Sequence, residues 1–193
     1  MGTGRLEAFS DGVIAIIITI MVLELKVPHE TSFEALRPVL PVLLSYVLSF
    51  IYVGIYWNNH HHMLHLVQTV TGPILWANLH LLFWLSLIPF VTAWMGENQL
   101  TTVPVALYGG VLLMAAFAYL ILMTLIIRHE GRDSSFAKAM GRDFKGKVSP
   151  VLYTAGIVMA FIQPLISVAL YVTVAAIWFI PDRRVERTLG AGS

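Results

Sequence analysis

Acidic, hydroxyl and imidazole side chains gather in two short stretches of an otherwise apolar chain. The first stretch, near the N-terminus, contains Arg5, Ser10 and Asp11. The second follows an apolar run and contains asparagines and histidines, namely Asn58, Asn59, His60, His61, His62 and His65. His61 and His65 are one helical turn apart, a spacing that can hold zinc, although no carboxylate or thiolate lies near them in the sequence. The histidines are therefore candidates for a metal site, for a buried polar network or for a solvated turn.

A polar network between the two stretches is the interpretation that we favour. Asp11 can accept hydrogen bonds from indole, imidazole or amide donors. Such donors are present at Trp57, at His60 and, in the next apolar stretch, at Asn78. These contacts would tie the first helix to the second and third. We expect no metal site and no cofactor.

A second pattern lies further along the first apolar stretch. At 3.6 residues per turn, Ile16, Ile20 and Leu23 form one stripe, with Thr19 beside them and Glu24 near the outer end. Several copies of such a helix around an axis would stack rings of branched apolar side chains, which exclude water when narrow and conduct ions when they widen. The alternative is ordinary packing inside a helical bundle, because nearly every membrane helix has such a stripe.

The composition indicates that membrane helices position these side chains. Of 193 residues, 58% are apolar and 12% are charged, against about a quarter charged in a soluble domain. The net charge of +1 leaves no excess positive field for nucleic acid, so we expect no nucleic-acid partner. The absence of cysteine removes disulfides, thiolate metal sites and thiol catalysis.

The expected fold class is an all-α integral membrane protein, a bundle of six transmembrane helices. Breakers in the hydropathy pattern place the spans at residues 6–25, 39–57, 74–95, 103–127, 148–163 and 165–180, in a single domain over residues 1–193. No span is expected to be interrupted at its centre by Gly or Pro. Residues 69–72 read Thr-Val-Thr-Gly, which faintly resembles a potassium-filter sequence, but no pore helix precedes them. We therefore discount this match.

The basic residues predict the orientation. With six spans and a cytoplasmic N-terminus, only Lys26 and Arg37 lie outside, whereas the inner segments hold ten basic residues: Arg5, Arg128, Arg132, Lys138, Arg142, Lys145, Lys147, Arg183, Arg184 and Arg187. Basic residues are enriched in cytoplasmic loops. We expect a multi-pass protein of the cell membrane with both termini in the cytoplasm.

The first half of the chain resembles the transmembrane-protein-175 family, which comprises the lysosomal potassium channel and shorter bacterial relatives. The signature is Arg5, three intervening residues, then Phe9, Ser10 and Asp11. The resemblance continues through the isoleucine-rich run that ends at residues 23–28, through Trp57 to His60, and from Asn78 to Pro89 and Phe90. The second half agrees only in length and hydropathy.

The resemblance implies a potassium-selective cation channel without a classic potassium-channel pore loop. It also implies assembly as a homotetramer in the bilayer, with the first helix of each subunit lining the pore. Ile16 matches the family's hydrophobic constriction, and Ile20 and Leu23 match further apolar layers. Thr19 matches a threonine that contributes to potassium preference. The residues expected to hold the pore helix in place are Arg5, Phe9, Ser10, Asp11, Trp57, His60 and Asn78. Ala15 departs from the serine of some relatives, so selectivity would depend on Thr19 alone.

Three rival classes are weighed against a channel, one of them a non-conducting assembly protein or chaperone. A small proton- or cation-coupled secondary transporter is the main alternative, because six helices and a histidine cluster could support alternating access. The chain shows no ionisable pair at mid-membrane, which is a usual mark of a coupled site. An enzyme is not expected, since there are no paired mid-membrane aspartates, no His-Glu-x-x-His motif and no serine nucleophile with a positioned base.

Overall fold

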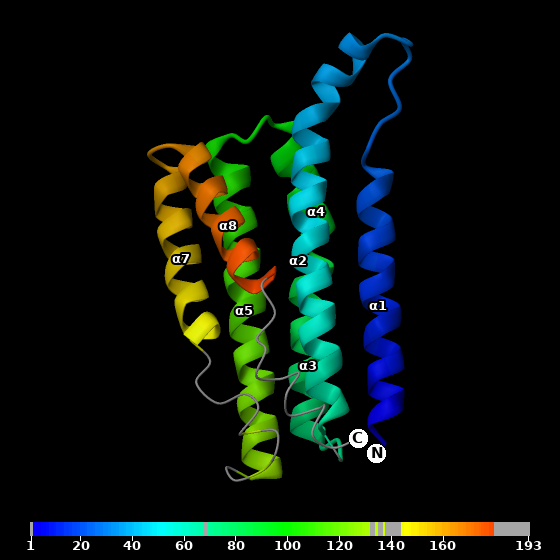
Figure 1. The fold of residues 1–193 in the computed structure, drawn as a ribbon, viewed down its shortest axis with the longest axis vertical. Helices are drawn as coiled ribbons and strands as arrows, with labels where there is room; N and C mark the ends of the chain where they lie inside the picture. The colour runs from blue at the N-terminus through cyan, green and yellow to red at the C-terminus, as the bar shows by residue number, and fades with distance from the viewer. Residues whose placement is uncertain (1, 68, 132–133, 135–136, 138–143, 180–193) are drawn as a thin grey trace.

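The computed structural model of the protein describes residues 2–67, 69–131, 134, 137 and 144–179. The described residues form eight helical elements in the order α1 (Thr3–Leu23), η1 (Phe33–Val39), α2 (Leu40–His65), α3 (Gly72–Ser86), α4 (Ile88–Glu97), α5 (Thr102–Glu130), α7 (Phe144–Ala160) and α8 (Pro164–Phe179). Because α3 and α4 follow one another along one rod, the bundle has six rods (Figure 1). The predicted all-α, six-helix fold class is confirmed.

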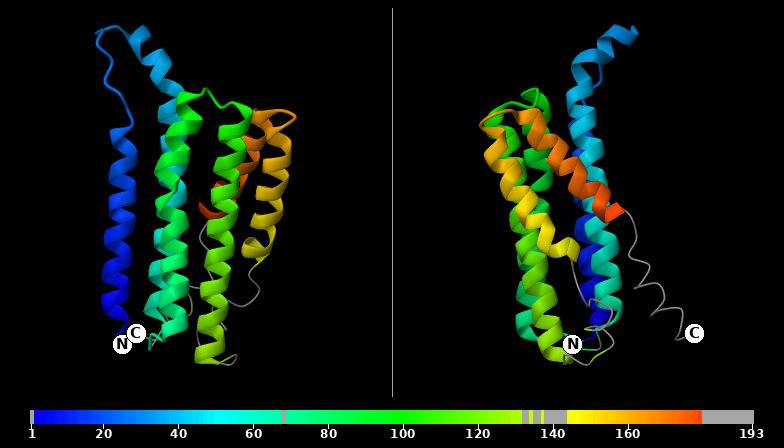
Figure 2. Two further views of the ribbon diagram at one scale, coloured as in Figure 1. Left: turned by 180° about the vertical axis from the view of Figure 1, so that it is seen from behind. Right: turned by 60° about the vertical axis from the view of Figure 1, so that its left-hand side comes forward.

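The third rod corrects one expectation, because it is interrupted near its middle. The helix α3 ends at Ser86 and α4 begins at Ile88. Pro89 lies in the first turn of α4 and has no backbone N–H, so the ladder of helical hydrogen bonds cannot run unbroken through this position. The rod nevertheless continues in one direction (Figure 2), so the proline ends one helix and starts the next without turning the chain back.

Among the described residues, four segments are long and apolar enough to cross a membrane: Thr3–Leu23, Phe33–His65, Gly72–Glu97 and Thr102–Glu130. A helix needs about 20 apolar residues to span the hydrocarbon core. The last two helices, α7 and α8, are shorter, with 17 and 16 residues. In a membrane, backbone groups must bond within the protein, and a helix satisfies them inside one segment, which explains why apolar runs bounded by prolines become helical rods.

The helix α1 lies at one edge of the bundle, and α7 and α8 lie at the opposite edge (Figures 1 and 2). Between them, α5 packs against α3, α4 and α7, and α2 packs against α1 and α4. The N-terminus and the C-terminal end of α5 lie at the same end of the bundle, far from the loop that holds Lys26. Of the predicted inner basic residues, Arg132, Lys138, Arg142, Arg183, Arg184 and Arg187 lie outside the described residues.

The core of the second half is built from tyrosines. Six of them are buried between α2, α5, α7 and α8: Tyr52, Tyr56, Tyr108, Tyr119, Tyr153 and Tyr171. The rings of Tyr108 and Tyr153 pack on Tyr171 at centroid distances of 5.8 and 6.3 Å. The Tyr52 hydroxyl donates to the Tyr171 carbonyl oxygen over 2.6 Å. Each buried hydroxyl of this kind needs a partner in an apolar interior, so these bonds specify how the helices meet.

Candidate functional site

The two sides of α1 have different surroundings. Leu6, Ile14, Ile17 and Met21 are buried against α2, α3 and α4. The opposite side is exposed along its length, at Arg5, Phe9, Gly12, Ile16, Thr19, Ile20 and Leu23. Both sides are apolar, so hydropathy alone does not distinguish the face that packs from the face that stays free.

A buried chain of hydrogen bonds joins α1, α2 and α3. Ser10 Oγ donates to the Leu6 carbonyl oxygen over 2.8 Å, and Asn78 Nδ2 donates to Ser10 Oγ over 2.9 Å. Asn78 Oδ1 lies 2.6 Å from His60 Nε2, which must donate because the amide oxygen only accepts. His60 is therefore protonated on Nε2. Its Nδ1 is buried without a partner among the described residues, so the chain of bonds ends there.

Two further contacts connect the first turns of α1 to the end of α2. Trp57 Nε1 donates to Asp11 Oδ1 over 3.0 Å, one of the contacts that the sequence indicated for Asp11. One turn further toward the N-terminus of α1, Glu7 Oε1 lies 2.8 Å from His61 Nδ1. The His61 ring stacks between Trp57 and His65, at centroid distances of 6.0 and 6.1 Å. Acceptors four residues apart on α1 thus match donors four residues apart on the antiparallel α2.

The network contains five of the seven signature residues: Ser10, Asp11, Trp57, His60 and Asn78. The other two, Arg5 and Phe9, lie on the exposed side of α1, in line with the apolar stripe. Sequence reasoning did not pair Glu7 with His61, although the matching four-residue spacings on two antiparallel helices are a signal for it. Within the described ranges, no group of three His, Asp or Glu side chains is arranged to hold a metal ion.

The apolar stripe is free of contacts that would bury it. The exposed fractions are 58% for Ile16, 43% for Ile20 and 77% for Leu23. Ile16 and Ile20 form one wall of an open groove of about 680 Å³. The other wall belongs to α4, with Phe90 and Trp94. Branched apolar side chains in the first helix are thus available for contact with lipid or with another protein surface.

Thr19 lies within this free side, and the direction of its hydroxyl bond bears on its chemistry. Thr19 Oγ1 donates to the carbonyl oxygens of Ile16, over 2.9 Å, and of Ala15, over 3.1 Å. The hydroxyl hydrogen is therefore directed at the helix backbone, and the oxygen lone pairs remain available on the exposed side. An oxygen presented in this way can coordinate a cation such as K⁺.

Three other polar contacts were not anticipated from the sequence. Lys26 Nζ, just beyond α1, lies 2.7 Å from Glu97 Oε1 at the end of α4. Trp84 Nε1 donates to His80 Nε2 over 2.9 Å on the outward side of α3. Thr69 Oγ1 lies 2.8 Å from His129 Nε2. Residues 69–72 lead into α3 at the end of the bundle that holds the N-terminus. Among the described residues this connection contains no pore loop.

Fold and site together define a multi-pass, all-helical membrane protein whose first helix is held by a buried polar network and leaves an apolar side free. Residues 5–89 match the family model of the endosomal/lysosomal potassium channel TMEM175. The chain is 56% identical over 189 residues to a potassium channel of Chryseobacterium sp. (strain P1-3), covering 98% of each chain. It is 36% identical over 125 residues to a potassium channel of Streptomyces collinus, covering 61% of each.

The fold is similar to the crystal structure of a lysosomal potassium-selective channel TMEM175 homolog from Chamaesiphon minutus. The TM-score is 0.78 and the identity is 30%, with 92% of this chain and 96% of that chain covered. This protein belongs to the TMEM175 family, as the signature around Asp11 indicated. Family membership places it among channels and not among enzymes.

Proposed function

We propose that the protein is a potassium-selective cation channel of the cell membrane, formed by four copies of the single six-helix domain with both termini in the cytoplasm. The exposed stripe of α1 is the observation that carries the proposal. A helix that buries Ile14, Ile17 and Met21 in its own subunit also presents Ile16, Ile20 and Leu23 to the outside. Rings of these side chains around a shared axis would form a hydrophobic constriction that closes by excluding water.

The anchoring of α1 supports a pore role for this helix. The bonds from Ser10 and Asp11 to α2 and α3 act at the inner half of the helix, on the side away from the stripe. They fix the rotational position of α1 about its own axis. This rotational position determines whether Ile16 or Ile17 points outward. Under this proposal Thr19 supplies the oxygen that favours K⁺, and the signature network acts by positioning.

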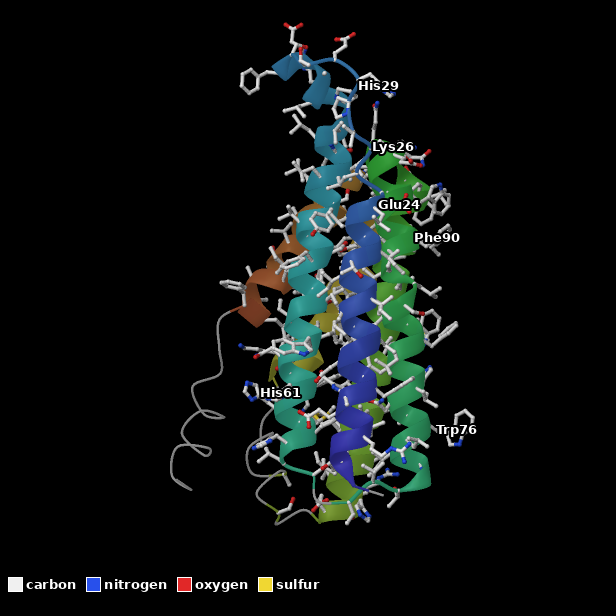
Figure 3. All side chains as sticks on the ribbon, turned by 90° about the vertical axis from the view of Figure 1, so that its right-hand side faces the viewer. Glu24, Lys26, His29, His61, Trp76 and Phe90 are labelled. Atoms are coloured by element: carbon white, nitrogen blue, oxygen red, sulfur yellow. The ribbon has the colours of Figure 1, made fainter. Side chains whose placement is uncertain are left out.

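The described basic residues support the proposed orientation. Arg5 and Arg128 belong to segments at one end of the bundle, whereas Lys26 lies at the other end (Figure 3). Lys145 and Lys147 lie in the first turn of α7, on the side of the bundle that is nearer to Arg5. Basic residues favour the cytoplasmic side. This distribution supports cytoplasmic termini, and with that orientation Glu24 would lie at the outer mouth of the proposed pore.

Reconstitution in planar bilayers under a potassium gradient tests the proposal. The channel should give unitary ohmic currents that are larger for K⁺ than for Na⁺. The substitution Ile16→Asn should increase conductance, because an amide wets the constriction. Val158→Asn, at an exposed position on α7, is the matched control and should leave conductance unchanged. Equal effects of the two variants would contradict a constriction at Ile16.

A coupled secondary transporter is the second candidate, and the break between α3 and α4 is the observation that favours it. Interrupted helices commonly line the substrate sites of transporters. A transporter would show slow, saturable flux without unitary steps, and its flux would respond to a proton or cation gradient. The same bilayer recordings therefore separate the two functions.

A further inference from the structure

His80 is a polar side chain of α3 that the proposed function does not use. It lies about 12 Å along α3 from the first residue of that helix, at about 1.5 Å per residue, and so within the depth of the hydrocarbon core. Its Nε2 accepts the Trp84 indole hydrogen, so in the neutral ring the proton is on Nδ1. No acceptor for this N–H lies within the part of the chain that the structure describes.

His80 lies among exposed aromatic side chains of the rod formed by α3 and α4. Trp76, one turn earlier, is 72% exposed, and Phe83 and Phe90 on the same rod are also exposed. Aromatic rings alone are compatible with lipid. A free N–H at membrane depth is not, since lipid tails offer no acceptor and polar groups there face protein or water. This edge of α3–α4 is therefore expected to be covered by protein.

The same subunit carries a complementary edge on the other side of α1. Figure 3 shows Trp76 and Phe90 to one side of α1 and His61 to the other. On the His61 side, Asp11 accepts from Trp57 with one carboxylate oxygen, and its second oxygen is available to another donor. The Ser10–Asn78 bond shows that these two residues lie at the same depth. Asp11 follows Ser10 by one residue on α1, and His80 follows Asn78 by two residues on α3, which runs in the same direction (Figure 1). The Asp11 carboxylate, an acceptor, and the His80 Nδ1–H, a donor, therefore lie at about the same depth on opposite edges of the subunit.

We propose that the α3–α4 edge of one copy packs against the α1–α2 edge of a second copy, and that His80 Nδ1 donates across this seam to Asp11. A ring built by rotation joins two different edges of each subunit, so every copy presents both partners. The α1 stripe lies between the two edges and faces the axis of such a ring. The inference rests on the proposed tetrameric channel and adds a contact between its neighbouring subunits.

Engineered thiols test the seam, because the natural chain contains no cysteine. Val47 on α2 and Phe90 on α4 are exposed and lie at about the same depth, counting about 1.5 Å per residue from the Asp11–Trp57 and Ser10–Asn78 contacts. In membranes, V47C/F90C treated with a short thiol-reactive linker should give covalent dimers, trimers and tetramers. The control V158C/F90C, with one thiol on α7, should remain monomeric on a denaturing gel.

Native mass spectrometry of the same preparations separates the two possible failures. A tetramer that gives no covalent oligomer overturns the seam and leaves the proposed channel intact. A monomer in native mass spectra, without potassium current, overturns the proposed channel itself. The hydrogen bond has its own test: H80F should lower the tetramer fraction at least tenfold, and H80Q, whose amide donates, should restore most of it. Equal tetramer fractions for H80F and the natural chain would overturn the role of His80.

Discussion

Asn78 of α3 donates its Nδ2 hydrogen to Ser10 Oγ of α1 over 2.9 Å, and both side chains are buried. The direction of this bond is determined by its neighbours, because the Ser10 hydrogen already goes to the Leu6 carbonyl oxygen. Ser10 therefore acts toward Asn78 only as an acceptor. The bond connects the proposed pore helix to the rod behind it at the level where the signature residues lie.

Ser10→Ala should destabilise the protein by about 1–3 kcal/mol, because a buried amide N–H of Asn78 loses its acceptor. Ser86→Ala is the matched control, since Ser86 is exposed and bonds only to the Phe83 carbonyl oxygen. Thermal unfolding in detergent, followed by the loss of the folded species on a sizing column, measures the difference. Equal unfolding temperatures for the two variants would show that the Ser10–Asn78 bond does not support the fold.

Thr19→Val should bring the potassium-to-sodium permeability ratio close to one, because the methyl group that replaces the hydroxyl cannot coordinate a cation. Thr19→Ser keeps the oxygen and should keep the preference. Reversal potentials under mixed potassium and sodium solutions are the measurement. An unchanged reversal potential in Thr19→Val would assign selectivity to another residue, while the size of the oligomer should be the same in all three proteins.

Gly109→Ala should be more harmful than Gly110→Ala, although the two glycines are adjacent on α5. A Cβ at Gly109 would overlap the Tyr171 hydroxyl, whereas a Cβ at Gly110 meets nothing within 4 Å. Overpacking of this kind costs about 1–3 kcal/mol. Gly110→Ala removes only backbone freedom and should be neutral or slightly stabilising. Similar stability of the two variants in thermal unfolding would mean that α8 shifts to accommodate the added methyl group.

The Lys26–Glu97 pair gives a pH dependence with a definite sign. Its hydrogen bond and the charge of Glu97 raise the pKa of Lys26 above the usual 10.5. A raised pKa in the folded protein stabilises it below the unfolded value and ceases to do so as the pH rises through the folded value. Lys26→Gln should therefore lower the unfolding temperature at pH 7 and at pH 9 alike. The difference should disappear only as the pH rises above 10.5, the usual pKa of a lysine, and a difference that disappears near pH 7 would exclude this pair as its source.

The sequence by itself determined the helical, membrane-spanning architecture. Apolar runs of this length, bounded by Pro28, Pro38, Pro73 and Pro104, form helices in a bilayer, because a helix satisfies their backbone groups with bonds inside each segment. The contact between Asp11 and Trp57 could also be predicted from the sequence, because a carboxylate near membrane depth needs donors and Trp57 is one of the few available. The family signature then suggested the proposed roles of Ile16 and Thr19, which periodicity did not.

Only the tertiary structure decided which side of α1 stays free. Ile14, Ile17 and Met21 are as apolar as Ile16, Ile20 and Leu23, so no hydropathy pattern separates the buried side from the exposed one. The choice depends on the rotation of the helix about its axis. That rotation is held by bonds from Ser10 and Asp11 to Asn78 and Trp57, residues that are distant in sequence and meet only when the antiparallel helices pack.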